Sequence, residues 1–298
     1  MATKKIYSII AGIFLITYAY NLFWFFKNVL EFSKYGFPIS FFIRYVPTFL
    51  GIAGVIVFIS SQYKRSNLLR MIMCMEIISF PFLAYWYIKF FTSTYGPLSM
   101  PAQLNWTFYA GVVINVSLLA SSVVGLRMLS FERTAKLSFI DHENERTAQF
   151  SPAPASLRFV NRLIDAVIIF YILWSNLELF TGASSRFDHI GMEFFIVFEI
   201  PIVLLYYIIL EGIFNTTAGK CATNTTIVNE RGERPDFGQV LGRTFCRLIP
   251  FEAFSFFADG ARGWHDSIPN TYVTESMNRE DLEMNEIILD AETNNLLS

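Results

Sequence analysis

Long apolar stretches with few or no charged residues constrain the fold of this chain more than any other feature. The first runs from Ile6 to Phe26, which is 21 residues without a charge. A transmembrane helix needs about 20 mostly apolar residues, and in lipid the backbone N–H and C=O groups must bond within the helix. Mostly apolar stretches with few charged residues occupy 41–61, 69–91, 106–129, 160–181 and 192–213. The sequence therefore predicts an all-α integral membrane protein of about six transmembrane helices.

The composition agrees with a membrane protein and argues against several other classes. Charged residues make up 16% of the chain, against about 25% in soluble domains. A net charge of −2 gives no basic field that would attract nucleic acid. Cys74, Cys221 and Cys246 have no CxxC spacing and no histidine placed to join them, so we expect no disulfide framework, metal site or cofactor.

The positions of Lys and Arg predict the orientation of the helices. Lys4 and Lys5 precede the first apolar stretch as in a signal peptide, but no small-residue cleavage site follows, so we expect a retained span. With the N-terminus inside, 18 of the 23 basic residues fall on the inner side, and the outer five are Lys27, Lys34, Arg44, Lys89 and Arg186. The positive-inside rule then favours both termini in the cytoplasm. We expect the bacterial inner (plasma) membrane.

The remaining segments divide the chain into regions. We expect a four-helix transmembrane region of unrecognised family at 1–130, a cytoplasmic linker at 131–157 and an acidic cytoplasmic tail at 274–298. The β-prone residues 225–228 and the turn residues after them predict a small β-hairpin at 222–238. Segment 239–259 is apolar but charged in places, which favours a cytoplasmic-side amphipathic helix, with a seventh span as the alternative.

Five short motifs follow one another in the region 158–273. They are Arg158-Phe-Val-Asn-Arg162-Leu-Ile-Asp165; Glu211 with Thr217-Ala-Gly219-Lys220; the turn with Gly232; Arg243 and Arg247; and His265-Asp266 with Thr271. In this order the region resembles the RDD family of membrane proteins. The family is named for one Arg and two Asp, which by position look like Arg158, Asp165 and Asp266. Ala218 departs from the Pro that many members carry before the Gly-Lys pair. The resemblance implies a membrane protein, for which ligand transport has been suggested.

The charged motif residues have structural and functional interpretations. Arg158, Arg162 and Asp165 lie on one helix face, where they could fasten the helix to its neighbours or to phospholipid head groups, or form a gate or ion site. Arg162, Arg243 or Arg247 could pair with Asp165. For Lys220 we expect contact with anionic lipid or a helix end. For His265 and Asp266 we expect a local cap or a salt link to an arginine.

Several acidic and amide residues fall within the predicted spans. Glu76 follows Arg70 in the third span, and Asn115 of the fourth span could satisfy it. Glu199 lies about 10 Å into the sixth span at 1.5 Å per residue, where Asn176 and Glu178 could face it. Such a cluster could carry protons or cations, or it could simply bond packed helices together. Glu211 is a further polar candidate near the end of the sixth span.

These features favour transport of a small ion or solute, with a membrane scaffold or assembly subunit as the alternative. A scaffold would hold partner proteins through the basic inner surface and the acidic tail. The bilayer, including anionic phospholipids, is the expected environment. We do not expect an enzyme, because no catalytic residues with a nucleophile or a metal stand out.

Overall fold

The computed structural model describes residues 2–32, 39–94, 106–142, 145–150, 152–176, 199–249 and 263–278. The chain divides into two compact units, of which the first contains Met1–Leu126 and Val167–Glu193 and the second contains Arg127–Ala166 and Phe194–Ser298. Each unit is described by itself below. In the described residues the protein is mostly helical, with a small three-stranded sheet in the second unit.

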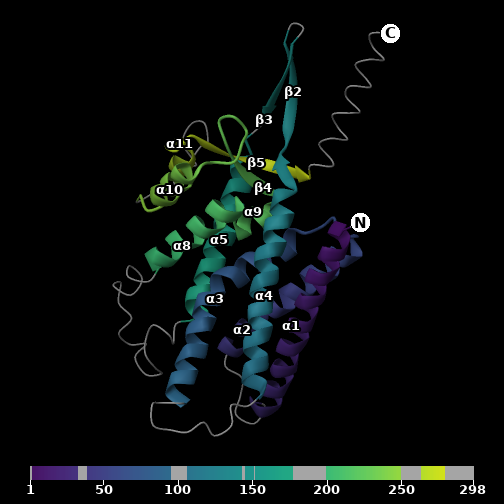
Figure 1. Ribbon diagram of the computed structural model, residues 1–298. Helices are drawn as coiled ribbons and strands as arrows, with labels where there is room; N and C mark the ends of the chain where they lie inside the picture. The colour runs from purple at the N-terminus through teal and green to yellow at the C-terminus, as the bar shows by residue number, and fades with distance from the viewer. Residues whose placement is uncertain are drawn as a thin grey trace. The chain divides into compact units, whose positions relative to one another are not determined.

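The first unit is built on long apolar helices (Figure 1). They are α1 (Ala2–Phe32), α2 (Ile39–Ser60), α3 (Asn67–Thr94) and α4 (Trp106–Phe131), whose last residues belong to the second unit. All four are long and apolar enough to cross a membrane. They correspond to the first four predicted spans, so the protein is a membrane protein with four candidate spans among the described residues.

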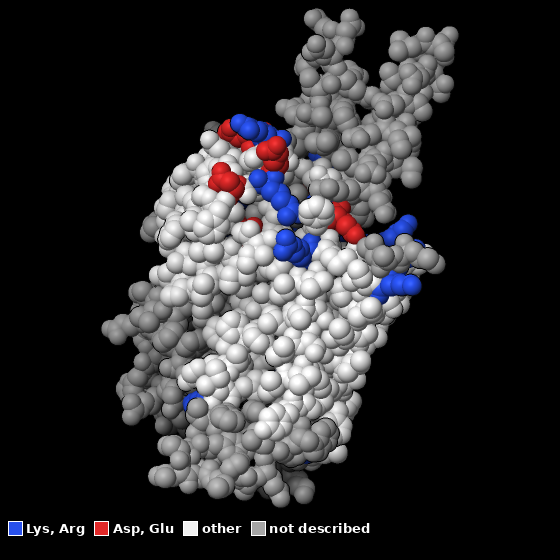
Figure 2. All heavy atoms as spheres, viewed as in Figure 1, with Lys and Arg blue, Asp and Glu red and all other residues white. Residues whose placement is uncertain are grey.

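Apolar side chains cover the outside of these helices as well as their interior. Ile16 is 66% exposed and Val113 is 64% exposed, while Phe14 and Phe58 are fully buried. The space-filling view shows a nearly uncharged surface over these helices (Figure 2). A helix that is apolar on both sides is typical of a lipid environment, because exposure of its outer apolar side chains to water would be unfavourable.

The prediction of six spans is not confirmed. The fifth predicted span, 160–181, overlaps α5 (Ala155–Ser175), and the sixth, 192–213, overlaps α8 (Ile200–Phe214), which has only 15 residues. Residues 177–198 lie outside the described ones. Because α5 begins with charged residues and α8 is short, neither is among the four candidate spans.

The second unit also contains strands, so the all-α prediction needs correction. Strand β5 (Thr271–Asn278) lies between β1 (Arg133–Ala135) and β4 (Thr225–Asn229), and all pairing is antiparallel. A separate pair consists of β2 (Leu137–His142) and β3 (Glu145–Phe150). The expected linker 131–157 thus holds three strands, and the expected tail 274–298 begins within β5; its residues 279–298 lie outside the described ones.

The hairpin predicted at 222–238 is wrong in its second strand. Strand β4 forms as predicted, and Gly232 supplies a left-handed turn residue with a φ of 76°. The chain then enters a helix, because Asp236 and Gln239 form a reciprocal capping box at the start of α10 (Phe237–Cys246). Strand β4 pairs instead with the distant β5, and Ile227 of β4 lies opposite Val273 of β5.

Helix α10 lies within the segment that we expected to be amphipathic. Its 10 residues span about 15 Å at 1.5 Å per residue, about half the thickness of a bilayer core, and residues 250–262 lie outside the described ones. The helix buries Arg243 and Thr244 and exposes Phe245, followed by exposed Leu248 and Ile249. Val240 and Cys246 are buried beside Arg243 and Thr244, so the buried side is mixed, while large apolar side chains face outward.

Candidate functional site

One face of α5 carries the first group of site residues. Arg158, Asn161 and Asp165 are spaced three and four residues apart, so they share a helix face. They are 8%, 5% and 2% exposed, whereas Phe159 and Leu163 on the opposite side are about half exposed. Helix α5 therefore buries its polar face in the second unit. A buried polar face needs partners in the same unit.

Asp165 joins three elements of the second unit. Its carboxylate accepts hydrogen bonds from the Tyr206 hydroxyl at 2.6 Å, the Thr217 hydroxyl at 2.8 Å and the Gly219 backbone N–H at 2.7 Å. Tyr206 lies on α8, while Thr217 and Gly219 lie at the start of α9 (Ala218–Thr223). These partners are not the arginines that the sequence suggested. The geometry is that of a carboxylate that fastens α5 to α8 and α9.

Gly219 allows the close approach of α9 to α5. A Cβ atom there would overlap the backbone carbonyl of Asn161, which cannot move aside as a flexible side chain could. We therefore expect Gly219→Ala to lower the free energy of unfolding by about 1–3 kcal/mol, as overpacking does elsewhere.

Thermal unfolding in a mild detergent checks this expectation, with Gly212→Ala as the matched control. A Cβ at Gly212 would have its nearest neighbours at 3.8 Å, an ordinary contact distance. Equal melting temperatures for the two variants would contradict the close packing of α9 on α5.

Glu211 is the centre of a buried ionic cluster. Its carboxylate accepts from Lys220 Nζ at 2.8 Å, from Arg243 Nε at 3.2 Å and from Arg247 Nη2 at 2.6 Å. All four side chains are at most 6% exposed. Lys220 thus pairs with a carboxylate, whereas we expected contact with lipid or a helix end. One carboxylate is shared by three cations, so this part of the cluster is electropositive.

Arg247 is held in place by charge and by an aromatic ring. Its guanidinium lies 3.7 Å from the centre of the Tyr207 ring, within the range of a cation–π interaction. Burial alone would lower the pKa of Arg247, but the Glu211 carboxylate raises it above the ordinary value. Arg247 is therefore a permanent cation at the end of α10.

Asp266 forms the second acidic centre of the cluster. Its carboxylate pairs with Arg243, which also donates to the Thr271 hydroxyl, and it lies 3.9 Å from Arg158 Nη1. His265 Nε2 is 3.7 Å away. The arginine salt link expected for Asp266 is therefore present. Burial would raise the pKa of Asp266, but Arg243 and His265 hold it below the ordinary value, so Asp266 is ionised at neutral pH.

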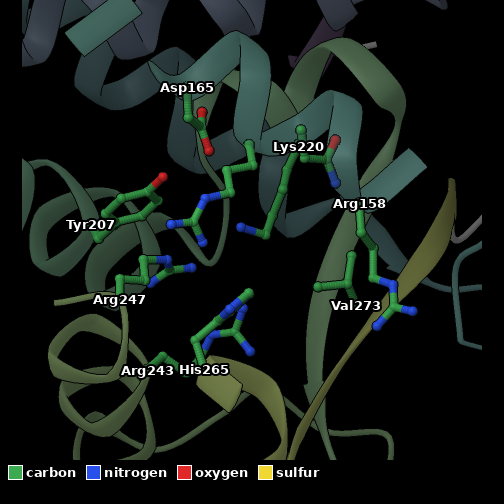
Figure 3. Close-up of a pocket in the computed structure, with 10 residues that line it drawn as sticks. Arg158, Asp165, Tyr207, Lys220, Arg243, Arg247, His265 and Val273 are labelled. Carbon is green, nitrogen blue, oxygen red and sulfur yellow. The ribbon is translucent and has the colours of Figure 1, made fainter. Parts of the chain in front are cut away.

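A pocket of about 20 Å³ opens within this cluster. Figure 3 shows Lys220, Arg247, Arg243 and His265 with their nitrogen-bearing ends gathered around one space, and Arg158 at its side. The wall is formed by α5, α8, α9, α10, α11 (Trp264–Ser267) and β5. Its residues are Arg158, Asn161, Arg162, Asp165, Tyr207, Lys220, Arg243, Arg247, His265 and Val273. We call this space the basic pocket. Seven of the nine motif residues singled out in the sequence line it, and the other two, Asp266 and Thr271, bond to Arg243.

Among the described polar residues that were predicted within the spans, Glu211 bonds to side chains of the basic pocket. Glu76 accepts from the Tyr18 hydroxyl at 3.4 Å and not from Asn115, whose amide donates to the Tyr87 hydroxyl at 3.0 Å. Asn176 donates back to the carbonyl of Ile172 at 2.8 Å. Glu199 is exposed at the start of α8, and Glu178 lies outside the described residues. In the described part of the chain, no group of three His, Cys, Asp or Glu could hold a metal ion.

Sequence reasoning missed three residues of the site. Asn161 stands inside the first motif and shares the face of Arg158 and Asp165, so the helical spacing could have found it. It donates to the Thr225 hydroxyl at 2.9 Å, which ties α5 to β4. Tyr206 and Tyr207 stand in an apolar run, where an aromatic residue gives no signal of a polar role.

Comparison with known proteins agrees with the placement of these motifs. The model of the RDD family matches residues 152–268. No curated protein and no solved structure matches the chain. The expected resemblance to the RDD family is thereby confirmed for the C-terminal half of the chain. The match contains all ten pocket residues except Val273. Together with the apolar helices, it makes the protein an integral membrane protein.

Proposed function

We propose that the protein is a transporter or channel-like module for a small ion or solute, and that its ligand enters the basic pocket. The observation that carries the proposal is the pocket itself, which charged side chains from widely separated motifs surround. Ionisable groups are costly to bury in a membrane protein and frequently mark ion or substrate pathways. The match to the RDD family supports the proposal only through the ligand transport that has been suggested for that family.

We further propose that the protein lies in a bacterial plasma membrane with both termini in the cytoplasm. Lys64 and Arg65 follow the end of α2 and are exposed there, as are Lys4 and Lys5 near the start of α1. Both groups belong to the inner side under the positive-inside rule. A Lys64→Cys variant in intact cells should then resist a membrane-impermeant thiol reagent and react after the membrane is opened. Rapid labelling of intact cells would reverse the orientation.

Flux through liposomes tests the transport proposal. Purified full-length protein is reconstituted, and uptake of chloride, phosphate, sodium and potassium tracers and of protons is compared with protein-free liposomes. We expect uptake of at least one of these ions, reduced several-fold by Arg162→Gln. Arg162 is the half-buried residue of the pocket wall, so this change disturbs the buried network least.

Two matched variants serve as controls for this assay. Arg231→Gln removes an exposed arginine from the turn after β4, and Glu199→Gln neutralises an exposed acid at the start of α8. Both should transport as the wild type does. Absence of uptake for every ion, or equal uptake by Arg162→Gln and the wild type, would overturn the proposal.

A membrane scaffold is the second candidate, and a polar recess favours it. The recess has a volume of about 430 Å³ and is lined by residues of the turn between β4 and α10, from Asn229 to Gln239. Charged side chains of both signs line it, which would suit a polar segment of a partner protein. Copurification in mild detergent tests this function, and recovery of the protein with no stable companion would count against it.

A further inference from the structure

We propose that the basic pocket binds an oxyanion, namely a single phosphate group. The inference rests on the proposed function in that it uses the same pocket, but it concerns binding and not movement across the membrane. The phosphate group could be inorganic phosphate or part of a phospholipid head group, and both share the chemistry that the pocket would recognise.

The balance of charge around the pocket favours an anion. Five basic side chains line it: Arg158, Arg162, Lys220, Arg243 and Arg247. Three carboxylates neutralise them in part: Asp165 in the wall, and Glu211 and Asp266 beside it. Among the residues that the structure describes, this set holds two more positive than negative charges, without counting His265. Buried charges are costly unless opposite charges lie near them, so a ligand in this pocket is favoured if it is an anion.

Two of the three carboxylates, those of Asp165 and Glu211, have little left to offer a cation. Both oxygens of Asp165 already accept hydrogen bonds, from Tyr206 and Gly219 on one side and from Thr217 on the other. Both oxygens of Glu211 accept from the cluster of basic side chains. The wall is otherwise dominated by Arg and Lys nitrogens, which donate hydrogen bonds and cannot accept them. A ligand with several acceptor oxygens matches such a wall.

One donor points specifically to a missing acceptor. Nη2 of Arg243 is buried and has no hydrogen-bond partner among the residues that the structure describes. The Nε and Nη1 atoms of the same guanidinium bond to Glu211, Asp266 and Thr271, so the side chain is fixed while one donor stays unused. Buried donors in native proteins nearly always have a partner. Because Arg243 lines the pocket, an oxyanion bound there could supply it.

The size of the pocket limits the ligand to one small group. A volume of about 20 Å³ slightly exceeds the roughly 10–15 Å³ that one water molecule requires on the same measure. A nucleotide or a sugar does not fit inside. A phosphate group would place one of its oxygens inside and keep the rest at the open side of the pocket, either as the inorganic ion or at the end of a lipid whose chains remain outside. The exposed apolar side chains of Phe159 and Leu163 on α5 would suit nearby acyl chains.

Binding to delipidated full-length protein in mild detergent tests the inference. Sodium phosphate is titrated by calorimetry against sodium chloride at equal ionic strength, and a short-chain phosphatidylglycerol is titrated against a short-chain diacylglycerol that lacks phosphate. We expect saturable binding of sodium phosphate, of phosphatidylglycerol or of both. Sodium chloride and the diacylglycerol should show no binding. Arg162→Gln should weaken this binding at least fivefold, and Arg231→Gln, remote from the pocket, should leave it unchanged.

The arms of the experiment identify the source of the phosphate and separate this inference from transport. Binding of inorganic phosphate would assign a soluble anion, and binding of phosphatidylglycerol alone would assign a lipid head group. Failure of both probes, or equal binding by the wild type and Arg162→Gln, would overturn the inference. Binding without flux would leave the inference standing and remove transport. Flux without binding of either probe would leave the transport proposal standing and remove the inference of a phosphate site.

Discussion

Replacing Glu211 by Gln is expected to lower the free energy of unfolding by about 3–5 kcal/mol, the cost of breaking a buried ion pair. Glu211 is 1% exposed, and it is the shared partner of Lys220, Arg243 and Arg247. Glutamine keeps the size of the side chain, but it removes the negative charge that the three cations share. Since typical domains are stable by only about 5–15 kcal/mol, the variant should lose a large share of its stability and unfold at a markedly lower SDS concentration.

Unfolding by added SDS, followed by circular dichroism and size-exclusion chromatography in mild detergent, measures this effect. Glu230→Gln is the matched control, because Glu230 is an exposed acid of the turn after β4. Its stability should stay within about 0.5 kcal/mol of the wild type. A Glu211→Gln variant as stable as this control would show that the cluster does not hold the unit together.

Replacing Asp165 by Asn should give the second largest loss. The carboxylate accepts three hydrogen bonds from buried donors, and asparagine turns one acceptor oxygen into an NH₂ group that must face a donor. Each buried donor left without an acceptor costs about 1–3 kcal/mol. We therefore expect the free energy of unfolding to fall by at least that amount, with looser attachment of α5 to α9.

Asp236→Asn provides a matched comparison for the same chemical change. Asp236 caps α10 at an exposed position, and its side chain accepts from the backbone N–H of Gln239 at 2.7 Å. Asparagine is about as good a cap as aspartate, so this variant should unfold like the wild type. If Asp165→Asn unfolded at the same SDS concentration as Asp236→Asn, the fastening role of Asp165 would be refuted.

The sequence was most informative where its signal was hydrophobic and local. The first four apolar stretches coincide with α1 to α4, because length and composition alone decide whether a helix can span a bilayer. The same criterion is not confirmed for the sixth stretch, because α8 is described only over 15 residues. For the strands, local propensity located β4 correctly but could not reveal its partner. Strand β5 follows β4 by more than 40 residues, and pairing at that distance depends on tertiary packing.

The members of the site were easier to predict than their partners. The motifs named Asp165, Glu211, Lys220, Arg243 and Asp266, and all of them lie in or beside one pocket. Charge alone suggested that Asp165 would pair with an arginine. In the structure its partners are hydroxyl groups and a backbone N–H, which carry no charge pattern that a sequence could display. The unexpected pairing of Lys220 with Glu211 also arises because α8 and α9 meet in the fold.

A double-mutant cycle between Glu211 and Arg247 tests most directly whether the region that matches the RDD family is organised around Glu211. Arg247 bonds this carboxylate through Nη1 at 3.3 Å and Nη2 at 2.6 Å. The free energies of unfolding of Glu211→Gln, Arg247→Met and the double variant are compared with that of the wild type. We predict a coupling of about 1–3 kcal/mol, as expected for buried side chains in contact within one ionic network. Additive effects, with a coupling below about 0.5 kcal/mol, would contradict the ionic cluster as the centre of this half of the protein.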